Sequence, residues 1–223
     1  MYLYGQAADA SLSDVVSKIR QVASSDQGDL GFLWEVYDAP GANPVALAAS
    51  YRAALQPIPQ GSILEYYMSY VTMYAHDKAN KTRDLQKVKP YMDTMLQLGM
   101  ASDIIKLQAH ATWAYAAHLR PYQLIDETAT YYLLSIQLYE QLPFFERMYA
   151  KYGALSHILF HTGDYKACIE YGSKALKGKQ WLTQQYDVSS AVMLLNTIGQ
   201  AYYQMGLYDS ALNYLAKSAA EAQ

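Results

Sequence analysis

The stretch LNTIGQAYYQMGLYDSA, residues 195–211, decides the fold of this chain. A second stretch, YGALSHILFHTGDYKAC at residues 152–168, carries similar residue types at the same spacing, 43 residues earlier. In each stretch an apolar helical pattern ends at a glycine, Gly206 or Gly163, and a tyrosine two places later begins the next helical pattern. The two stretches therefore predict two helical hairpins, each with a tight turn at its glycine.

A shorter pattern extends the repeat toward the N-terminus. A small or apolar residue followed three places later by Tyr occurs five times, and the first members lie 40, 41, 39 and 43 residues apart. Residues three apart share one face of a helix, so the first residue permits close helix packing and the Tyr fills the space beside it. The five pairs are Ala48/Tyr51, Val88/Tyr91, Ala129/Tyr132, Cys168/Tyr171 and Ala211/Tyr214.

The rest of the chain is also helical in pattern, and signals for β-strands are nearly absent. We therefore expect an all-α protein, with N-terminal helices that cap the fold over residues 1–43 and a repeat domain over residues 44–223. The clearest repeats are 149–178 and 192–223. The expected helices follow an apolar stripe from Leu12 to Val22 and span 30–37, 44–55, 62–76, 85–98, 102–118, 125–141, 144–162, 165–176, 188–205 and 208–222.

The two quoted stretches resemble the tetratricopeptide repeat (TPR), with Gly199 and Ser156 at the position where its two helices pack closely. The resemblance implies a right-handed α-solenoid of about five hairpins, with a period of about 40 in place of the usual ~34. The long period resembles repeats of kinesin light chains and of some bacterial regulators. The segments GDYKACIEYG at 163–172 and GLYDSALNYL at 206–215 resemble sensor regions of Bacteroidetes signalling proteins.

The resemblance also implies a ligand groove, because the first helices of TPR hairpins line a concave face. The expected groove residues are His157, Phe160, His161, Asn196, Gln200, Tyr203 and Gln204. Their polar and aromatic side chains suit an extended or helical peptide, and a solvated face without a ligand is the alternative. The stretches that carry Lys and Arg in carboxylate-clamp members offer Ala150, Gly153, Met193 and Asn196 here, which disfavours that kind of binding.

Composition argues against several other classes. A net charge of −3 without a basic block disfavours nucleic-acid binding, and no run of residues is apolar enough to predict a membrane span. No phosphate loop or nucleophile motif is present, so we expect no enzyme and no cofactor. His157 and His161 stand at a zinc-chelating spacing, but nothing nearby in sequence completes a site and we expect no metal. Cys168 is expected to be a small core residue.

The leading interpretation is a non-catalytic protein- or peptide-binding module, the sensory or interaction segment of a larger bacterial signalling or regulatory protein. One alternative is a scaffold that spaces or dimerises attached domains, through an uncapped C-terminal helix from Tyr208 to Gln223. A second alternative is a helical enzyme or small-ligand carrier. The compartment stays open between bacterial cytoplasm and periplasm, with periplasm favoured if Met1 to Ala7 follows a removed signal peptide.

Overall fold

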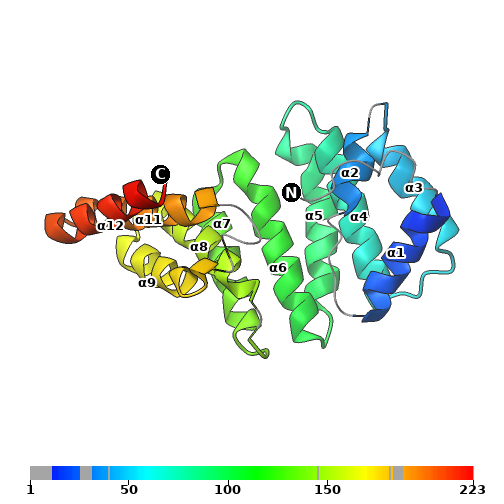
Figure 1. Cartoon of the computed structure of the whole chain (residues 1–223). Helices are drawn as coiled ribbons and strands as arrows, with labels where there is room; N and C mark the ends of the chain where they lie inside the picture. Colours follow the sequence, from blue (N-terminus) through cyan, green and yellow to red (C-terminus); the bar gives the residue numbers. More distant parts are fainter. Residues whose placement is uncertain are drawn as a thin grey trace. The chain divides into compact units, whose positions relative to one another are not determined.

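The computed structural model describes residues 12–25, 32–39, 41–144, 146–180, 182 and 188–222, and every regular element in these ranges is helical (Figure 1). The prediction of an all-α fold is thereby confirmed. The contacts within the chain define two compact units, Met1–Ala111 and Thr112–Gln223. The boundary between these units falls inside one helix. The boundary predicted near residue 43 is a different one, between the N-terminal helices and the repeats, and it stays a prediction. The expectation for Met1 to Ala7 lies outside the described residues.

The first unit contains five helices and the start of a sixth, described over these ranges: α1 Leu12–Ser25, α2 Phe32–Asp38, α3 Pro44–Ala54, α4 Ile63–Ala79, α5 Leu85–Met100 and α6 Ile105–Leu119. Helix α4 lies at its centre and packs against α1, α3 and α5. Helix α5 approaches α6 very closely at Gly99, where an added Cβ atom would lie 2.2 Å from the Cβ of Ala111.

Tyrosines of α4 form part of the core of the first unit. Tyr66, Tyr67 and Tyr74 are buried, and Tyr70 is half-buried. The Tyr66 hydroxyl lies 2.5 Å from Nδ1 of His110 in α6, so this ring nitrogen is satisfied within the core. The four tyrosines therefore serve helix packing.

The second unit contains the end of α6, the short 3-10 turn η2 Arg120–Tyr122, and helices α7 Ile125–Tyr139, α8 Met148–Thr162, α9 Tyr165–Leu176, α11 Val188–Gln204 and α12 Tyr208–Glu221. Helices α8 and α9 form one hairpin, α11 and α12 form another, and α11 also packs against α9 (Figure 1). Gly163 and Gly206 turn these hairpins with φ angles of +82° and +74°, a region that glycine enters at no steric cost. The two hairpins predicted from residues 152–168 and 195–211 are confirmed.

The small residues of the repeat occupy the predicted packing positions. Ala48, Val88, Ala129, Cys168 and Ala211 are all buried. At Gly199 an added Cβ atom would lie 2.8 Å from Cγ of Leu215, so α11 and α12 touch there. Across the other hairpin the Ser156 hydroxyl donates to the Cys168 carbonyl at 2.8 Å, which fixes α8 on α9. Burial raises the pKa of the Cys168 thiol, as expected for a core cysteine.

Most helix boundaries lie within a few residues of the predicted ones, and the largest difference is at the start of α8. We expected this helix to begin at Phe144, but it begins at Met148. Phe144 is 60% exposed and its ring packs edge-on against Tyr149, at 5.2 Å between centroids. Phe144 continues the apolar pattern because its ring contacts Tyr149, and it lies before the first turn of the helix.

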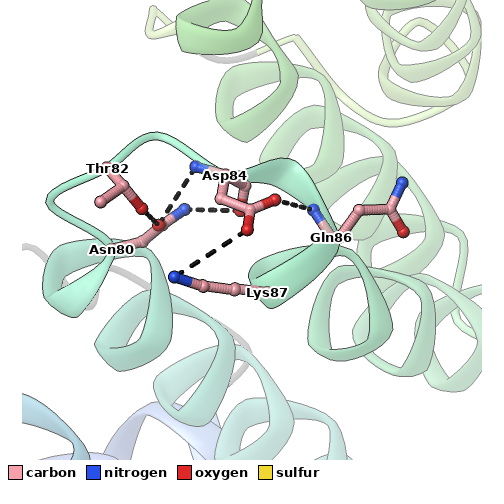
Figure 2. Close-up of polar contacts among 5 residues, drawn as sticks. All are labelled: Asn80, Thr82, Asp84, Gln86 and Lys87. Carbon is pink, nitrogen blue, oxygen red and sulfur yellow. Dashed lines mark hydrogen bonds and ion pairs between the residues drawn. The ribbon is translucent and has the colours of Figure 1, made fainter.

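The turn between α4 and α5 shows how side chains begin a helix (Figure 2). A carboxylate oxygen of Asp84 accepts the backbone N–H of Gln86 at 3.1 Å, and Nζ of Lys87 lies 3.9 Å from the other oxygen. The Asn80 side chain accepts the N–H of Asp84 at 3.2 Å and donates to its carbonyl at 2.8 Å. The bonds to the N–H groups of Asp84 and Gln86 satisfy donors that the first turn of α5 leaves without helical partners.

We expect Asp84→Ala to lower the free energy of unfolding by about 1 kcal/mol, because the first turn of α5 loses its capping acceptor. Asp84→Asn is the matched variant, since its amide oxygen can still cap the helix. Urea unfolding followed by circular dichroism measures both. Equal losses in the two variants would show that the ion pair with Lys87, and not the cap, carries the stability.

Candidate functional site

A cavity of about 310 Å³ opens between α8 and α11 in the second unit. Small residues on α8 make the room for it, because Ala150, Gly153 and Ala154 present little bulk at one face of the helix. On the facing helix, Met193 is 59% exposed and forms an open edge. The full lining is Arg120, Ala150, Gly153, Ala154, His157, Leu182, Ser190, Met193, Leu194 and Thr197.

The seven predicted groove residues are all accessible, but only His157 lines this cavity. Phe160 and His161 continue from it toward the end of α8, with ring centroids 4.7 Å apart for His157 and His161 and 5.5 Å apart for Phe160 and His161. The other four predicted residues are exposed on α11: Asn196, Gln200, Tyr203 and Gln204. The ring of Tyr203 packs on Tyr208 at the start of α12, 5.5 Å between centroids.

The cavity has a polar corner made by Arg120 and His157. Burial lowers the pKa of His157, and the charges of His161 and Arg120 lower it further, so its imidazole is neutral at neutral pH. A neutral imidazole offers one hydrogen-bond donor and one acceptor. Arg120 also bonds the Tyr132 hydroxyl, whose pKa is raised by burial and partly lowered again by this guanidinium. Among the described residues that line the cavity none is acidic.

Beside this face, Lys151 of α8 occupies a different environment. Its Nζ lies 3.9 Å from the ring centroid of Trp113 and 4.5 Å from that of Tyr139. Burial, reinforced by the charge of Arg147, lowers the pKa of Lys151 to about 7. In the described part of the chain no carboxylate forms an ion pair with this ammonium, so two aromatic faces are its electrostatic partners.

The histidine pair has the geometry of two neighbouring side chains on one helix face. Within the residues that the structure describes, no set of three or more His, Cys, Asp or Glu side chains comes together around a metal-sized site. The same residues include no helix that combines the length and apolar character needed to cross a bilayer.

Sequence reasoning missed several residues of the cavity. Arg120 comes from the η2 turn before α7, far along the chain from α8 and α11, and no local pattern connects it with them. Met193 and Thr197 could have been predicted as lining residues, because they lie three positions before and one position after Asn196 on α11. Ala150, Gly153 and Met193, noted only for lacking charge, turn out to shape the cavity wall.

No protein-family model and no curated protein matches the chain. Solved structures do match it, among them BtubC (BKLC) from P. vanneervenii, with a TM-score of 0.69 and 16% identity, covering 100% of this chain and 91% of that one. Another is a Podosopora anserina protein described as a putative kinesin light chain with nearly identical TPR-like repeats. It matches with a TM-score of 0.62 and 11% identity over 95% of this chain and 94% of that one, and a single-residue variant of it matches at 0.61.

These likenesses establish the fold: the chain is a TPR-like helical-repeat protein. The resemblance to kinesin light chains drawn from the sequence agrees with the description of two of these structures. At these low identities the likeness carries no ligand or partner over to this chain.

Proposed function

We propose that the second unit binds a peptide segment of a partner protein along the face formed by α8 and α11. The observation that supports this most directly is the cavity of about 310 Å³ on that face, beside seven accessible polar and aromatic residues. A cavity of this size lies at the lower end of the range for ligand sites and suits one anchoring side chain. The chain would then be the sensory or interaction segment of a larger bacterial signalling or regulatory protein.

The chemistry of the face favours a peptide with an apolar anchor and polar flanks. Met193, Leu194 and Leu182 supply apolar contacts inside the cavity. Asn196, Gln200 and Gln204 repeat at intervals of four on α11, so their amides follow one exposed line that can hydrogen-bond a peptide backbone. Because the helices are already packed, ordering the scaffold on binding costs little.

A scaffold role is the second candidate, and a separate observation favours it. Tyr208 and Leu212 on α12 are 63% and 70% exposed and lie outside the set of residues that lines the cavity. Such a surface can join copies or domains while the groove stays empty. An enzyme or small-ligand carrier has less support, because the cavity is half-open. Among the described residues that line it, only Arg120 and His157 are titratable.

The groove proposal predicts that the triple variant His161→Ala, Tyr203→Ala and Gln204→Ala loses peptide capture without unfolding. A phage library of random peptides is selected on the natural protein, and the affinity of a selected peptide is measured by fluorescence anisotropy. We expect affinity to fall by about 100-fold or more, since aromatic and polar anchors carry most of the energy of such interfaces.

The matched control replaces three accessible side chains of α9 and its C-terminal end with alanine instead, Lys166, Glu170 and Lys177. It should bind the selected peptide as the natural protein does. Circular dichroism checks that both triple variants keep the helical fold. Normal capture by the His161, Tyr203 and Gln204 variant would overturn the groove proposal.

A further inference from the structure

The last two hairpins of the second unit present the same pattern of accessible side chains. In each hairpin a polar side chain, an aromatic ring, a second polar side chain and a second ring follow at the same spacing, and every member is exposed or half-buried. Each member of the later set lies 43 residues after its counterpart. We call them the repeated sets: His157, Phe160, His161 and Tyr165 in the α8–α9 hairpin, and Gln200, Tyr203, Gln204 and Tyr208 in the α11–α12 hairpin.

The two rings of each set meet across the turn of their hairpin in nearly the same way. The centroids of Phe160 and Tyr165 lie 5.7 Å apart, with 56° between the ring planes. Those of Tyr203 and Tyr208 lie 5.5 Å apart, with 59° between the planes. Phe160 and Tyr165 are only half-buried although the α11–α12 hairpin follows them. An accessible ring pair is therefore a feature of the repeat that persists when the next hairpin is in place.

The two ring pairs are separated by about one helix diameter. Helix α11 packs directly against α8, and the axes of packed helices lie about 8–10 Å apart. Because the hairpins are successive repeats of a solenoid, equivalent residues of α8 and α11 are displaced by about that distance. A ligand that contacts both ring pairs therefore needs matching groups on one of its sides, about 8–10 Å apart.

A peptide in the polyproline II conformation has this period. It rises about 3.1 Å per residue with three residues per turn, so residues three apart face the same side at a distance of about 9.3 Å. Proline favours this conformation, and its apolar ring packs against aromatic side chains. We propose that the peptide bound by the second unit is a proline-rich segment with prolines three residues apart, one on each ring pair. This inference rests on the proposed function and names the class of peptide.

Other peptide conformations match the repeated sets less well. In a β-strand, residues on one side are two apart, about 6.6 Å, which is too short. In an α-helix, residues seven apart share a face at about 10.5 Å, close to the required distance, but the backbone carbonyls are bonded within the helix. The exposed amides of Gln200 and Gln204 would then have no backbone acceptor. A polyproline II segment has no internal hydrogen bonds, so its carbonyls can accept from these amides.

The charge of the repeated sets also matches such a segment. They contain no Asp, Glu, Lys or Arg, so they complement an uncharged peptide. Proline has no backbone N–H and offers only its carbonyl, for which the side-chain N–H groups of Gln200 and Gln204 are suitable donors. His157 belongs to the first set and also lines the cavity, so a peptide that follows the repeated sets passes beside the cavity.

A fluorescent peptide of Pro-Ala-Gln repeated four times tests the period. It spans about 37 Å in the polyproline II conformation and so covers both ring pairs. Pro-Ala-Gln-Ala repeated three times has the same length, but successive prolines face different sides. Fluorescence anisotropy, with protein titrated to about 1 mM, should show at least about tenfold tighter binding of the first peptide, because the second loses one ring pair. Ala-Ala-Gln repeated four times tests a helical occupant and should bind more weakly still.

Two protein variants test whether both ring pairs are used. Phe160→Ala and Tyr203→Ala should each lower the affinity for the Pro-Ala-Gln peptide by about tenfold, since each removes one ring from one pair. Lys177→Ala is the control, because Lys177 is exposed at the end of α9 and lies outside the repeated sets. Circular dichroism checks that all three variants keep the helical fold.

Equal binding of the Pro-Ala-Gln and Pro-Ala-Gln-Ala peptides, tighter binding of the alanine peptide, or full affinity in either ring variant would each overturn the inference. Peptides from the random library separate it from the groove proposal. If they bind at the groove but lack prolines three apart, the groove proposal stands and the proline-rich class is wrong. If no peptide binds, selected or designed, both are wrong.

Discussion

Replacing Gly99 with alanine should destabilise the first unit by about 3 kcal/mol, a large loss for the addition of a single methyl group. The new Cβ atom would lie 2.2 Å from the Cβ of Ala111 and 3.0 Å from Cε2 of Tyr66. An alanine has no rotamer by which to move away, so α5 and α6 must separate. The separation would also disturb the contact between Tyr66 and His110 in the tyrosine core.

The sign of this effect is informative because glycine to alanine inside a helix is normally stabilising, by about 0.5–1 kcal/mol. Gly153 in α8 provides the matched control. An added Cβ atom there meets nothing closer than the Cβ of Ala175 at 3.8 Å, an ordinary contact. Gly153→Ala should therefore be neutral or stabilising in urea unfolding, while Gly99→Ala loses stability. Similar changes in both variants would contradict the close approach of α5 and α6.

The second large effect concerns Lys151 and pH. Burial holds the pKa of Lys151 near 7, below its unfolded value of 10.5. At pH values between these two, Lys151 is mostly protonated in the unfolded chain and mostly neutral in the folded chain. Stability must therefore rise as pH increases from about 7 toward 10.5, and the full cost of the buried charge remains at pH below 7. Such a fall in pKa corresponds to at most about 5 kcal/mol, at roughly 1.36 kcal/mol per unit.

We expect a measured contribution of about 2 kcal/mol, since the side chain is half-buried and the ring faces of Trp113 and Tyr139 offset part of the cost. Lys151→Met keeps the apolar stem and removes the charge. It should be more stable than the natural chain at pH 6.5, and the difference should shrink as the pH is raised to 9.5. Urea unfolding at several pH values measures the difference.

Two further measurements make the result specific to Lys151. Lys166→Met, at an exposed position of α9, should follow the pH dependence of the natural chain. In the NMR spectrum of the carbon-13-methylated protein, one lysine signal should titrate near pH 7 and be missing in Lys151→Met. Parallel stability curves for the natural chain and Lys151→Met, or titration of Lys151 above pH 10, would show that its ammonium is well solvated.

The sequence predicts the helical hairpins because their determinants are local. Gly206 and Gly163 mark turns, and the small residues that follow, Ala211 and Cys168, mark the packed face of the second helix. Both kinds of signal depend on residues a few positions apart, which a helix brings together by its period alone. The same reasoning placed Gly199 at a helix contact, and its Cβ position against Leu215 confirms it.

The cavity could be predicted only in part, because its walls come from separate elements. His157 follows from the repeat, but Arg120 reaches the same cavity from the η2 turn. The setting of Lys151 is similar: its partners, Trp113 and Tyr139, belong to α6 and α7. Nothing in the spacing of one helix reports which side chains of other helices converge on it, so burial and pKa depend on tertiary packing.

The buried thiol of Cys168 can be used to measure how fast the α8–α9 hairpin opens locally. It is the chain's one cysteine, and it is buried at the α8–α9 contact beneath the Ser156 hydroxyl. A thiol reagent in solution reaches this sulfur only when the hairpin parts, so the rate of labelling at saturating reagent equals the rate of that opening. The labelling rate can be followed by mass spectrometry with and without a selected peptide. A slower rate with the peptide would show that an occupied groove suppresses local opening of the hairpin.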